Sequence, residues 1–247
     1  MTDRARFAVW HKWDRNFFAG FVVVGWFLVV MGFYGSVRER IAGHADFPAP
    51  PILLLHIVVF TGWMLLLTAQ VLLIRADRRD IHRRLGMIGV ALVPLMVVTG
   101  IGAEVVSQRF YAVKYPDNLN FFIMPLIEML VFTLCAVAAL MWRKDAAAHK
   151  RLIFLATSMA LVAATNRWWG EGLYELYGDG FWGMITHNFA GPNVLMAVAV
   201  GYDWLTRGRV HRVYWVAVPL ILGGEVVASV IYHDPAWAGV VKWMIGI

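Results

Sequence analysis

The sequence predicts an all-α integral membrane bundle of seven transmembrane helices, on the basis of three observations. Sixty per cent of the 247 residues are apolar and only 15% are charged, which is far from the composition of a soluble domain. Seven apolar stretches are each about 17–24 residues long, and about 20 helical residues span the hydrocarbon core of a bilayer. The basic residues are concentrated in alternate polar segments. We therefore expect residues 1–247 to form one polytopic membrane domain.

The seven expected spans are separated by polar segments too short to form separate domains. The spans lie near residues 17–35, 51–74, 85–107, 120–142, 150–166, 188–206 and 213–233. The first span follows a charged segment and has no small-residue cleavage pattern after it, so we expect it to remain as an anchor. The single cysteine, Cys135, lies within the fourth span and has no partner in the chain, which excludes an intrachain disulfide.

The basic residues predict the orientation of the bundle. Sixteen of the 22 Lys and Arg residues lie in alternate polar segments, namely Arg4, Arg6, Lys12 and Arg15; Arg75, Arg78, Arg79, Arg83 and Arg84; Arg143, Lys144, Lys150 and Arg151; and Arg207, Arg209 and Arg212. Basic residues near span ends stay in the cytoplasm. The amino terminus is therefore expected inside and the carboxyl terminus outside, in a bacterial inner (cytoplasmic) membrane. The net charge of +6 indicates contact with the lipid bilayer and no nucleic acid.

Two of the basic connections resemble each other. Asp80-Ile81-His82-Arg83-Arg84-Leu85-Gly86 opens the third span, and Asp145-Ala146-Ala147-Ala148-His149-Lys150-Arg151-Leu152 opens the fifth. Each contains an Asp able to cap a helix start, followed by His, two cations and Leu. The similarity predicts a duplicated unit in which spans 2–5 form a four-helix core of two hairpins.

The two histidines of these connections are the most ligand-like residues in the chain. His82 and His149 are expected at the same depth near the inner surface, on different helices of the core. A b-type haem requires two imidazoles that face each other, with cations near its propionates. Such cations are Arg83, Arg84, Lys150 and Arg151. The alternative is an interfacial helix start whose cations bind lipid phosphate.

A second group of polar residues is expected in the outer half of the membrane. Buried ionisable residues in a bilayer are costly and are commonly functional. His56, Glu104, Glu128 and His187 lie at similar depths on four spans, which predicts a polar pocket. Imidazole and carboxylate ligands suit zinc, iron or copper, so these four residues are candidate ligands of a transition metal. His56 and His187 are also a candidate pair for a second haem.

Span 2 connects the two groups. His56, Trp63 and Gln70 are seven residues apart and therefore share one face of the helix. Because Gln and His are poor neighbours for lipid, we expect this face to point into the bundle.

These residues carry a resemblance to a known family. His56, Trp63 and Gln70, followed by His82-Arg83-Arg84-Leu85-Gly86, Glu128 and His149-Lys150-Arg151-Leu152, resemble an uncharacterised bacterial family of multi-pass membrane proteins over residues 50–167. The resemblance implies a membrane protein but no particular reaction. The hairpin plan is also loosely similar to that of transmembrane dihaem b-type cytochromes, which implies paired histidines on a four-helix core. This chain departs from that pattern, because only His56 lies well within a span.

Two functional hypotheses follow. The first is a b-type haem-binding electron-transfer protein that works with quinol or another membrane redox partner. The second is a non-redox membrane protein, either a carrier for a small solute or lipid or an assembly factor, with a polar or metal-binding pocket in its outer half. The sequence contains no nucleotide-binding loop and no HExxH motif, so it does not decide whether the protein is an enzyme.

Overall fold

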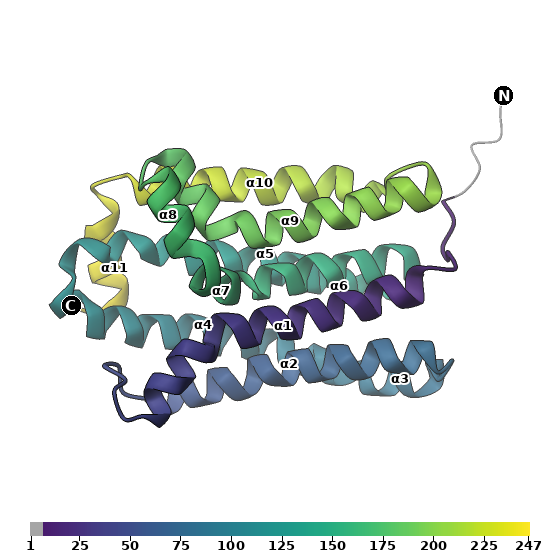
Figure 1. Cartoon of the computed structure of the whole chain (residues 1–247), viewed down its shortest axis with the longest axis horizontal. Coiled ribbons are helices and arrows are strands. Elements are labelled where there is room, and N and C mark those ends of the chain that lie inside the picture. Colours follow the sequence, from purple (N-terminus) through teal and green to yellow (C-terminus); the bar gives the residue numbers. More distant parts are fainter. Residues whose placement is uncertain (1–6) are drawn as a thin grey trace.

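The computed structural model describes residues 7–247 as a bundle of long helices that run side by side (Figure 1). The elements are α1 (Asp14–Ile41), α2 (Pro51–Arg75), α3 (Arg79–Leu85), α4 (Met87–Lys114), the 3-10 helix η1 (Pro116–Phe122), α5 (Ile123–Met141), α6 (Ala146–Ala160), α7 (Val162–Thr165), the π-helical turn η2 (Asn166–Gly170), α8 (Glu171–Tyr177), α9 (Phe181–Arg207), α10 (Arg212–Tyr232) and α11 (Trp237–Ile245). No strand occurs in this described part of the chain. Arg4 and Arg6, which contribute to the orientation argument, lie outside it.

Five helical segments are long and apolar enough to cross a membrane. They are Asp14–Ile41, Pro51–Arg75, Arg79–Lys114, Asn118–Met141 and Arg212–Tyr232. A sixth is obtained if α6 and the helix that follows it, bent by 41°, count as one span. The remaining expected span corresponds to α9, which has 27 residues but is not among the apolar segments. Its polar residues, among them Asn188, Asn193 and Asp203, lower its hydropathy.

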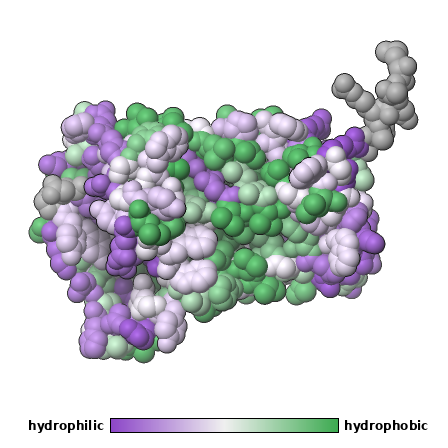
Figure 2. Space-filling view, turned by 45° about the horizontal axis from the view of Figure 1, so that its top comes forward, coloured by the Kyte–Doolittle hydropathy of each residue, from purple (hydrophilic) through white to green (hydrophobic). Residues whose placement is uncertain are grey.

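The surface agrees with a multi-pass membrane protein. Figure 2 shows apolar side chains gathered over the middle of the bundle and polar ones at its two ends. On α2 and α10, large apolar residues such as Val58, Leu65, Val216 and Leu220 are more than half exposed. Exposed apolar patches of this extent indicate contact with an apolar phase. The outward faces of these helices are therefore suited to lipid.

The core consists of two hairpins and the helices packed around them. α2 packs against α4, and α5 packs against α6, which are the most extensive contacts in the bundle. α5 is the most buried span, with Met124, Phe132 and Ala136 wholly enclosed. α3 lies at one end of the bundle, called the α3 end below, whereas α8 and α11 lie at the other, called the α11 end (Figure 1).

The helix starts of the two hairpins differ. Asp145 is the N-cap of α6, and its carboxylate accepts hydrogen bonds from the amides of Ala147 and Ala148 at 3.0 and 3.1 Å. This is the expected cap. Asp80 was expected to play the same part, but α3 begins one residue earlier, and its cap residue Arg78 bonds no helix amide through its side chain. Asp80 instead accepts a hydrogen bond from Arg78 at 3.2 Å.

Gly32 allows α1 to approach α7 closely. A Cβ atom at this position would overlap the backbone of Ala164, and backbone atoms cannot move aside as a side chain can. We expect Gly32→Ala to destabilise the protein by about 1–3 kcal/mol, the usual cost of overpacking a filled core. Reversible unfolding in mixed detergent micelles, followed by tryptophan fluorescence, measures this change.

Gly35 provides the matched control on the same helix. No atom lies within 4 Å of a Cβ built there, so Gly35→Ala adds no clash. Because alanine is favoured over glycine in a helix by about 1 kcal/mol, this variant should be as stable as the native protein or more stable. Equal stability of the two variants would show that α1 and α7 do not pack at Gly32.

Candidate functional site

A cavity of about 830 Å³ lies at the α3 end, between the two hairpins and beside α1. This volume is within the range of about 300–1,000 Å³ that is usual for ligand and cofactor pockets. Most of its wall is apolar, formed by residues such as Leu66, Val71, Val90, Ala136 and Leu140. The few polar side chains in the wall therefore determine what it can bind.

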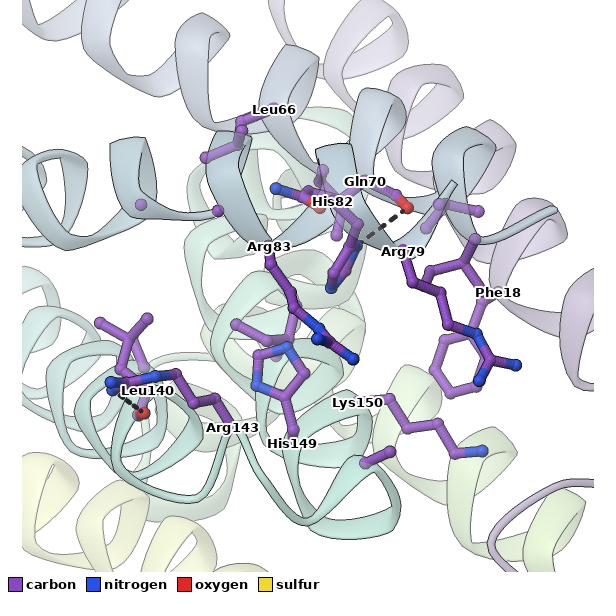
Figure 3. Close-up of a pocket in the computed structure, with 18 of the residues that line it drawn as sticks. Phe18, Leu66, Gln70, Arg79, His82, Arg83, Leu140, Arg143, His149 and Lys150 are labelled. Atoms are coloured by element: carbon purple, nitrogen blue, oxygen red, sulfur yellow. Dashed lines mark hydrogen bonds between the residues drawn. The ribbon is translucent and has the colours of Figure 1, made fainter. Parts of the chain in front are cut away.

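His82 and His149 extend into this cavity from its two opposite walls (Figure 3). His82 belongs to α3 and His149 to α6, so each comes from a different hairpin. Their ring centres are 6.5 Å apart and their planes are nearly perpendicular, at 87°. The structure thus brings together the two histidines that the sequence selected.

Each of the two rings is held by the hairpin to which it belongs. Nδ1 of His149 lies 2.9 Å from the carbonyl oxygen of Ala139, and Nδ1 of His82 lies 3.4 Å from that of Gln70. A carbonyl oxygen only accepts hydrogen bonds, so Nδ1 must carry the proton and donate. Nε2 of each ring then keeps a lone pair, as in metal-binding histidines oriented by a backbone carbonyl.

Gln70 lines the same cavity with an unsatisfied side chain. Its Oε1 and Nε2 atoms are both buried and have no hydrogen-bond partner among residues 7–247. Buried polar groups without partners are uncommon in native proteins. Trp63, seven residues before Gln70 on the same face of α2, also lines the cavity. Its Nε1–H donates to Oγ1 of Thr157 at 3.1 Å. The inward face predicted for α2 is confirmed at both positions.

The cations around the cavity are only partly those expected. Of the four named from the sequence, Arg83 and Lys150 line the cavity, whereas Arg84 and Arg151 do not. The other basic residues that line it are Arg15, Arg75, Arg79, Arg143 and Lys144.

Lys150 and Arg151 are engaged in ion pairs within the protein. Nζ of Lys150 donates to Asp14 of α1 at 2.7 Å. Arg151, only 2% exposed, donates to Asp203 of α9 through Nε at 2.7 Å and also through Nη2. Residues two apart in a helix point in nearly opposite directions, because each step turns by about 100°. Arg151 therefore cannot face the same way as His149. Among the described residues, four arginines that line the cavity have no carboxylate partner, namely Arg75, Arg79, Arg83 and Arg143.

A histidine near this ionic network is neutral. His211 precedes α10 and donates its backbone N–H to Asp203 at 3.2 Å. Burial and the nearby Arg151 lower the pKa of the His211 ring to about 4. The neutral ring can therefore accept the hydrogen bond from the amide of Val213, 3.3 Å away, and cap α10.

The segment before α1 lies over the mouth of the cavity. Nζ of Lys150 is 4.3 Å from the ring centre of Trp10, and the guanidinium of Arg79 is 5.8 Å from it. The carbonyl of Val9 also accepts a hydrogen bond from Lys150 at 2.7 Å. These contacts connect residues 9 and 10 to both hairpins, and no local sequence pattern predicts them.

Of the four residues expected to hold a metal in the outer half, three have the following contacts in the structure. His187 has its Nε2 3.0 Å from Sδ of Met184, and His56 stacks against Phe60 with ring centres 4.1 Å apart. Glu104 accepts a hydrogen bond from Gln108 at 2.8 Å. No group of three or more His, Cys, Asp and Glu residues with a metal-binding arrangement occurs within residues 7–247. No ring contact joins His56 to His187, in contrast to His82 and His149.

Comparison with known proteins adds no relative. No family model, curated protein or solved structure matches the chain. Its function must therefore be argued from the cavity and its residues.

Proposed function

We propose that the protein is a membrane electron-transfer protein that binds one b-type haem between His82 and His149. The observation that carries this proposal is the pair of imidazoles at 6.5 Å, each with Nδ1 bound to a backbone carbonyl and Nε2 free. Two rings held in this way on facing helices are the usual axial ligands of a haem in a helical bundle.

The separation of the rings fits one iron between them. A metal–imidazole bond is about 2 Å long, and the centre of the ring lies about 1 Å behind the bonding nitrogen. Two imidazoles on opposite faces of one ion therefore have centres about 6 Å apart. The observed distance between the ring centres, 6.5 Å, is close to this value.

The surroundings of the rings also suit a haem. Apolar side chains from both hairpins line the cavity and would contact the macrocycle. Arg79 and Arg83 line it without a carboxylate partner among the described residues, so they are available to the two propionates. A bound haem supplies one-electron exchange, with a potential set by its axial ligands and its burial.

The protein's own residues determine the orientation and basicity of the ligands. The carbonyls of Gln70 and Ala139 accept from the Nδ1–H groups, which fixes each ring and makes Nε2 more basic. The unsatisfied amide of Gln70 can donate a hydrogen bond to a propionate inside the cavity. The Lys150–Asp14 pair holds α1 against α6 beside the site.

We further propose that the chain crosses the bacterial inner membrane seven times, with the haem at its cytoplasmic end. The start of α1 and the carboxyl-terminal residues lie at opposite ends of the bundle, as an odd number of crossings requires (Figure 1). The α3 end contains most of the basic residues, which favours the cytoplasmic side. Electrons would be exchanged there with a membrane or soluble redox partner.

The absorption spectrum of the purified protein tests the haem proposal. Protein extracted in mild detergent from haem-replete cells is expected to show a Soret band that shifts, and visible bands that sharpen, on reduction with dithionite. Extraction of the pigment with acidic acetone and mass spectrometry should identify haem b. A colourless preparation with no iron would refute the proposal.

The apolar wall of the cavity and the arginines that line it favour a second candidate function. The cavity would suit an amphiphile with an anionic head group. Its tail would contact the apolar wall, and its head group would pair with Arg79 and Arg83. A carrier function for such a lipid would explain the two arginines, but it would not explain the two oriented imidazoles. Lipid identified by mass spectrometry in a haem-free preparation would favour the carrier.

A further inference from the structure

Glu225 is a carboxyl group enclosed within the apolar span α10. It lies seven residues before Tyr232, the last residue of the helix, which corresponds to about 10 Å along the axis. The residue is only 1% exposed. Asn193 of α9 donates a hydrogen bond from Nδ2 to Oε2 of Glu225 at 2.8 Å. The two side chains therefore form a polar pair between α9 and α10, in the half of the bundle toward the α11 end.

Two oxygens of this pair have no hydrogen-bond partner among the described residues. They are Oε1 of Glu225 and Oδ1 of Asn193, and both are buried. Carboxylate and amide oxygens can only accept hydrogen bonds, so an ionised Glu225 leaves two acceptors of one pair unsatisfied. Buried acceptors without a donor are costly and uncommon in native proteins. The pair therefore lacks a donor.

Within the described residues, no cation compensates a negative charge on Glu225. The elements packed against α10 are α5, α6, α9 and η1. α5 faces the turn before Glu225 with Ile127 and Val131, which lie 3.5 and 3.7 Å from a Cβ built at Gly224 and are apolar.

The ionisable side chains of these packed helices also leave Glu225 unpaired. In the half of the bundle toward the α11 end, the described ones are Glu128 of α5 and His187 of α9, besides Tyr232 of α10 itself. None of the three forms an ion pair or a hydrogen bond with Glu225. The ionisable residues of α6 lie in its first turns, at the α3 end. Because an unpaired charge within a membrane span is costly, the carboxyl group is more stable in its neutral form.

We propose that Glu225 is a proton-binding site within the membrane and that Asn193 positions the bound proton. A proton on Oε1 makes Glu225 a neutral acid whose O–H donates to Oδ1 of Asn193, while Nδ2 continues to donate to Oε2. One proton thereby removes the charge and satisfies both unpartnered oxygens. Acidic residues within membrane spans are frequent members of proton relays. The inference does not depend on the haem, because neither residue lines its cavity.

The pair lies close to the lipid-facing surface of the bundle. Asn193 is only half-buried, and on α10 the large apolar residues Leu222 and Val226 are exposed. No atom lies within 4 Å of a Cβ built at Gly223, two residues before Glu225. A small lipid-soluble molecule can therefore approach the pair from the hydrocarbon.

Labelling with dicyclohexylcarbodiimide tests whether Glu225 carries a proton. A nitrogen of this lipid-soluble reagent takes the proton of a neutral acid, and the carboxyl oxygen then bonds to the central carbon, so that the whole reagent is added and nothing leaves. The full-length protein in lipid nanodiscs at neutral pH is expected to gain the label at Glu225, which peptide mass spectrometry locates. Glu225→Gln should lose this label. Glutamine is neutral and has nearly the same shape, so this variant should fold.

Asp203 is the matched control within the same protein. It is also 1% exposed, but it accepts hydrogen bonds from the guanidinium of Arg151 and is therefore stabilised as a carboxylate. Because a carboxylate has no proton to give to the carbodiimide, Asp203 should remain unlabelled in the preparation that is labelled at Glu225.

Infrared spectra of the native protein and of Glu225→Gln provide a second measurement, which does not depend on access by a reagent. The C=O bond of a neutral acid absorbs at a higher frequency than the backbone amides, whereas a carboxylate absorbs at a lower one. We expect a high-frequency band that the variant lacks and that shifts in D₂O, because the bound proton exchanges. In Asn193→Leu the band should move to a still higher frequency, because the C=O group loses the hydrogen bond from Nδ2.

Three results would contradict the inference. Absence of the high-frequency band from the difference spectrum would overturn the proton-binding site, whatever the labelling shows. Protection of Glu225 from the carbodiimide by sodium chloride, but not by choline chloride, would also overturn it, since the two oxygens would then bind a metal cation. A band that is unchanged in Asn193→Leu would overturn the positioning role of Asn193.

Discussion

Replacement of either His82 or His149 by leucine is expected to abolish the haem spectrum of the purified protein. In the proposed site each ring would supply one of the two axial positions, so either variant would leave the iron with a single imidazole. The loss should be nearly complete for each single variant. It is measured as the dithionite-reduced minus oxidised absorbance per mole of protein.

The fold should survive these two substitutions. Both rings are half-buried and each loses one hydrogen bond to a carbonyl, worth about 1 kcal/mol. Leucine is compatible with the apolar wall of the cavity. His187→Leu is the matched control, because His187 is a buried histidine that does not line the cavity. Full haem content in either His82→Leu or His149→Leu would exclude this pair as the ligands.

Much of the core could be predicted because it depends on local patterns. The length of the apolar stretches identifies most spans, and the repeated Asp…His…Leu pattern placed two histidines at equivalent positions of two hairpins. The structure confirms that both rings enter one cavity. It also shows why the repeat has this form, since each histidine bonds a carbonyl of the preceding helix in its own hairpin.

The ionic partners could not be predicted from the sequence. Lys150 and Arg151 follow His149 directly, but their carboxylates, Asp14 and Asp203, are 136 and 52 residues away. Such pairs depend on how α1 and α9 pack against α6, which no local pattern specifies. Arg79 was counted among the basic residues but not as a cavity residue, because its position depends on the start of the short helix α3.

Some predicted span boundaries differ from the helix ends in the structure for a related reason. α9 begins at Phe181, seven residues before the expected span, because the segment from Phe181 to His187 is already helical. The bend after Ala160 and the π-helical turn at Asn166–Gly170 gave no sequence signal either. The fifth span was predicted to end at residue 166, which lies within this π-helical turn.

Asp203→Ala is expected to be the most destabilising single substitution in the ionic network. Asp203 is 1% exposed and accepts from the guanidinium of Arg151, which is 2% exposed, and from the backbone of His211. Arg207 lies 3.7 Å from the same carboxylate. Removal of one partner of a buried pair leaves an uncompensated charge and costs about 3–5 kcal/mol. Detergent-induced unfolding measures the difference.

Two further variants identify the cause of this loss. Asp77→Asn removes the charge of an ion pair with Arg15 in which both side chains are about half exposed, and it should cost no more than about 1 kcal/mol. Asparagine tolerates the left-handed backbone of this residue (φ 55°) as aspartate does. The double variant Arg151→Met with Asp203→Leu removes both charges and fills the space with apolar atoms, so it should recover most of the stability lost in Asp203→Ala. If the double variant is as unstable as Asp203→Ala, the cost does not come from the unpaired Arg151. The position would then depend on the hydrogen bond from His211 and on Arg207, which neither leucine nor alanine can replace.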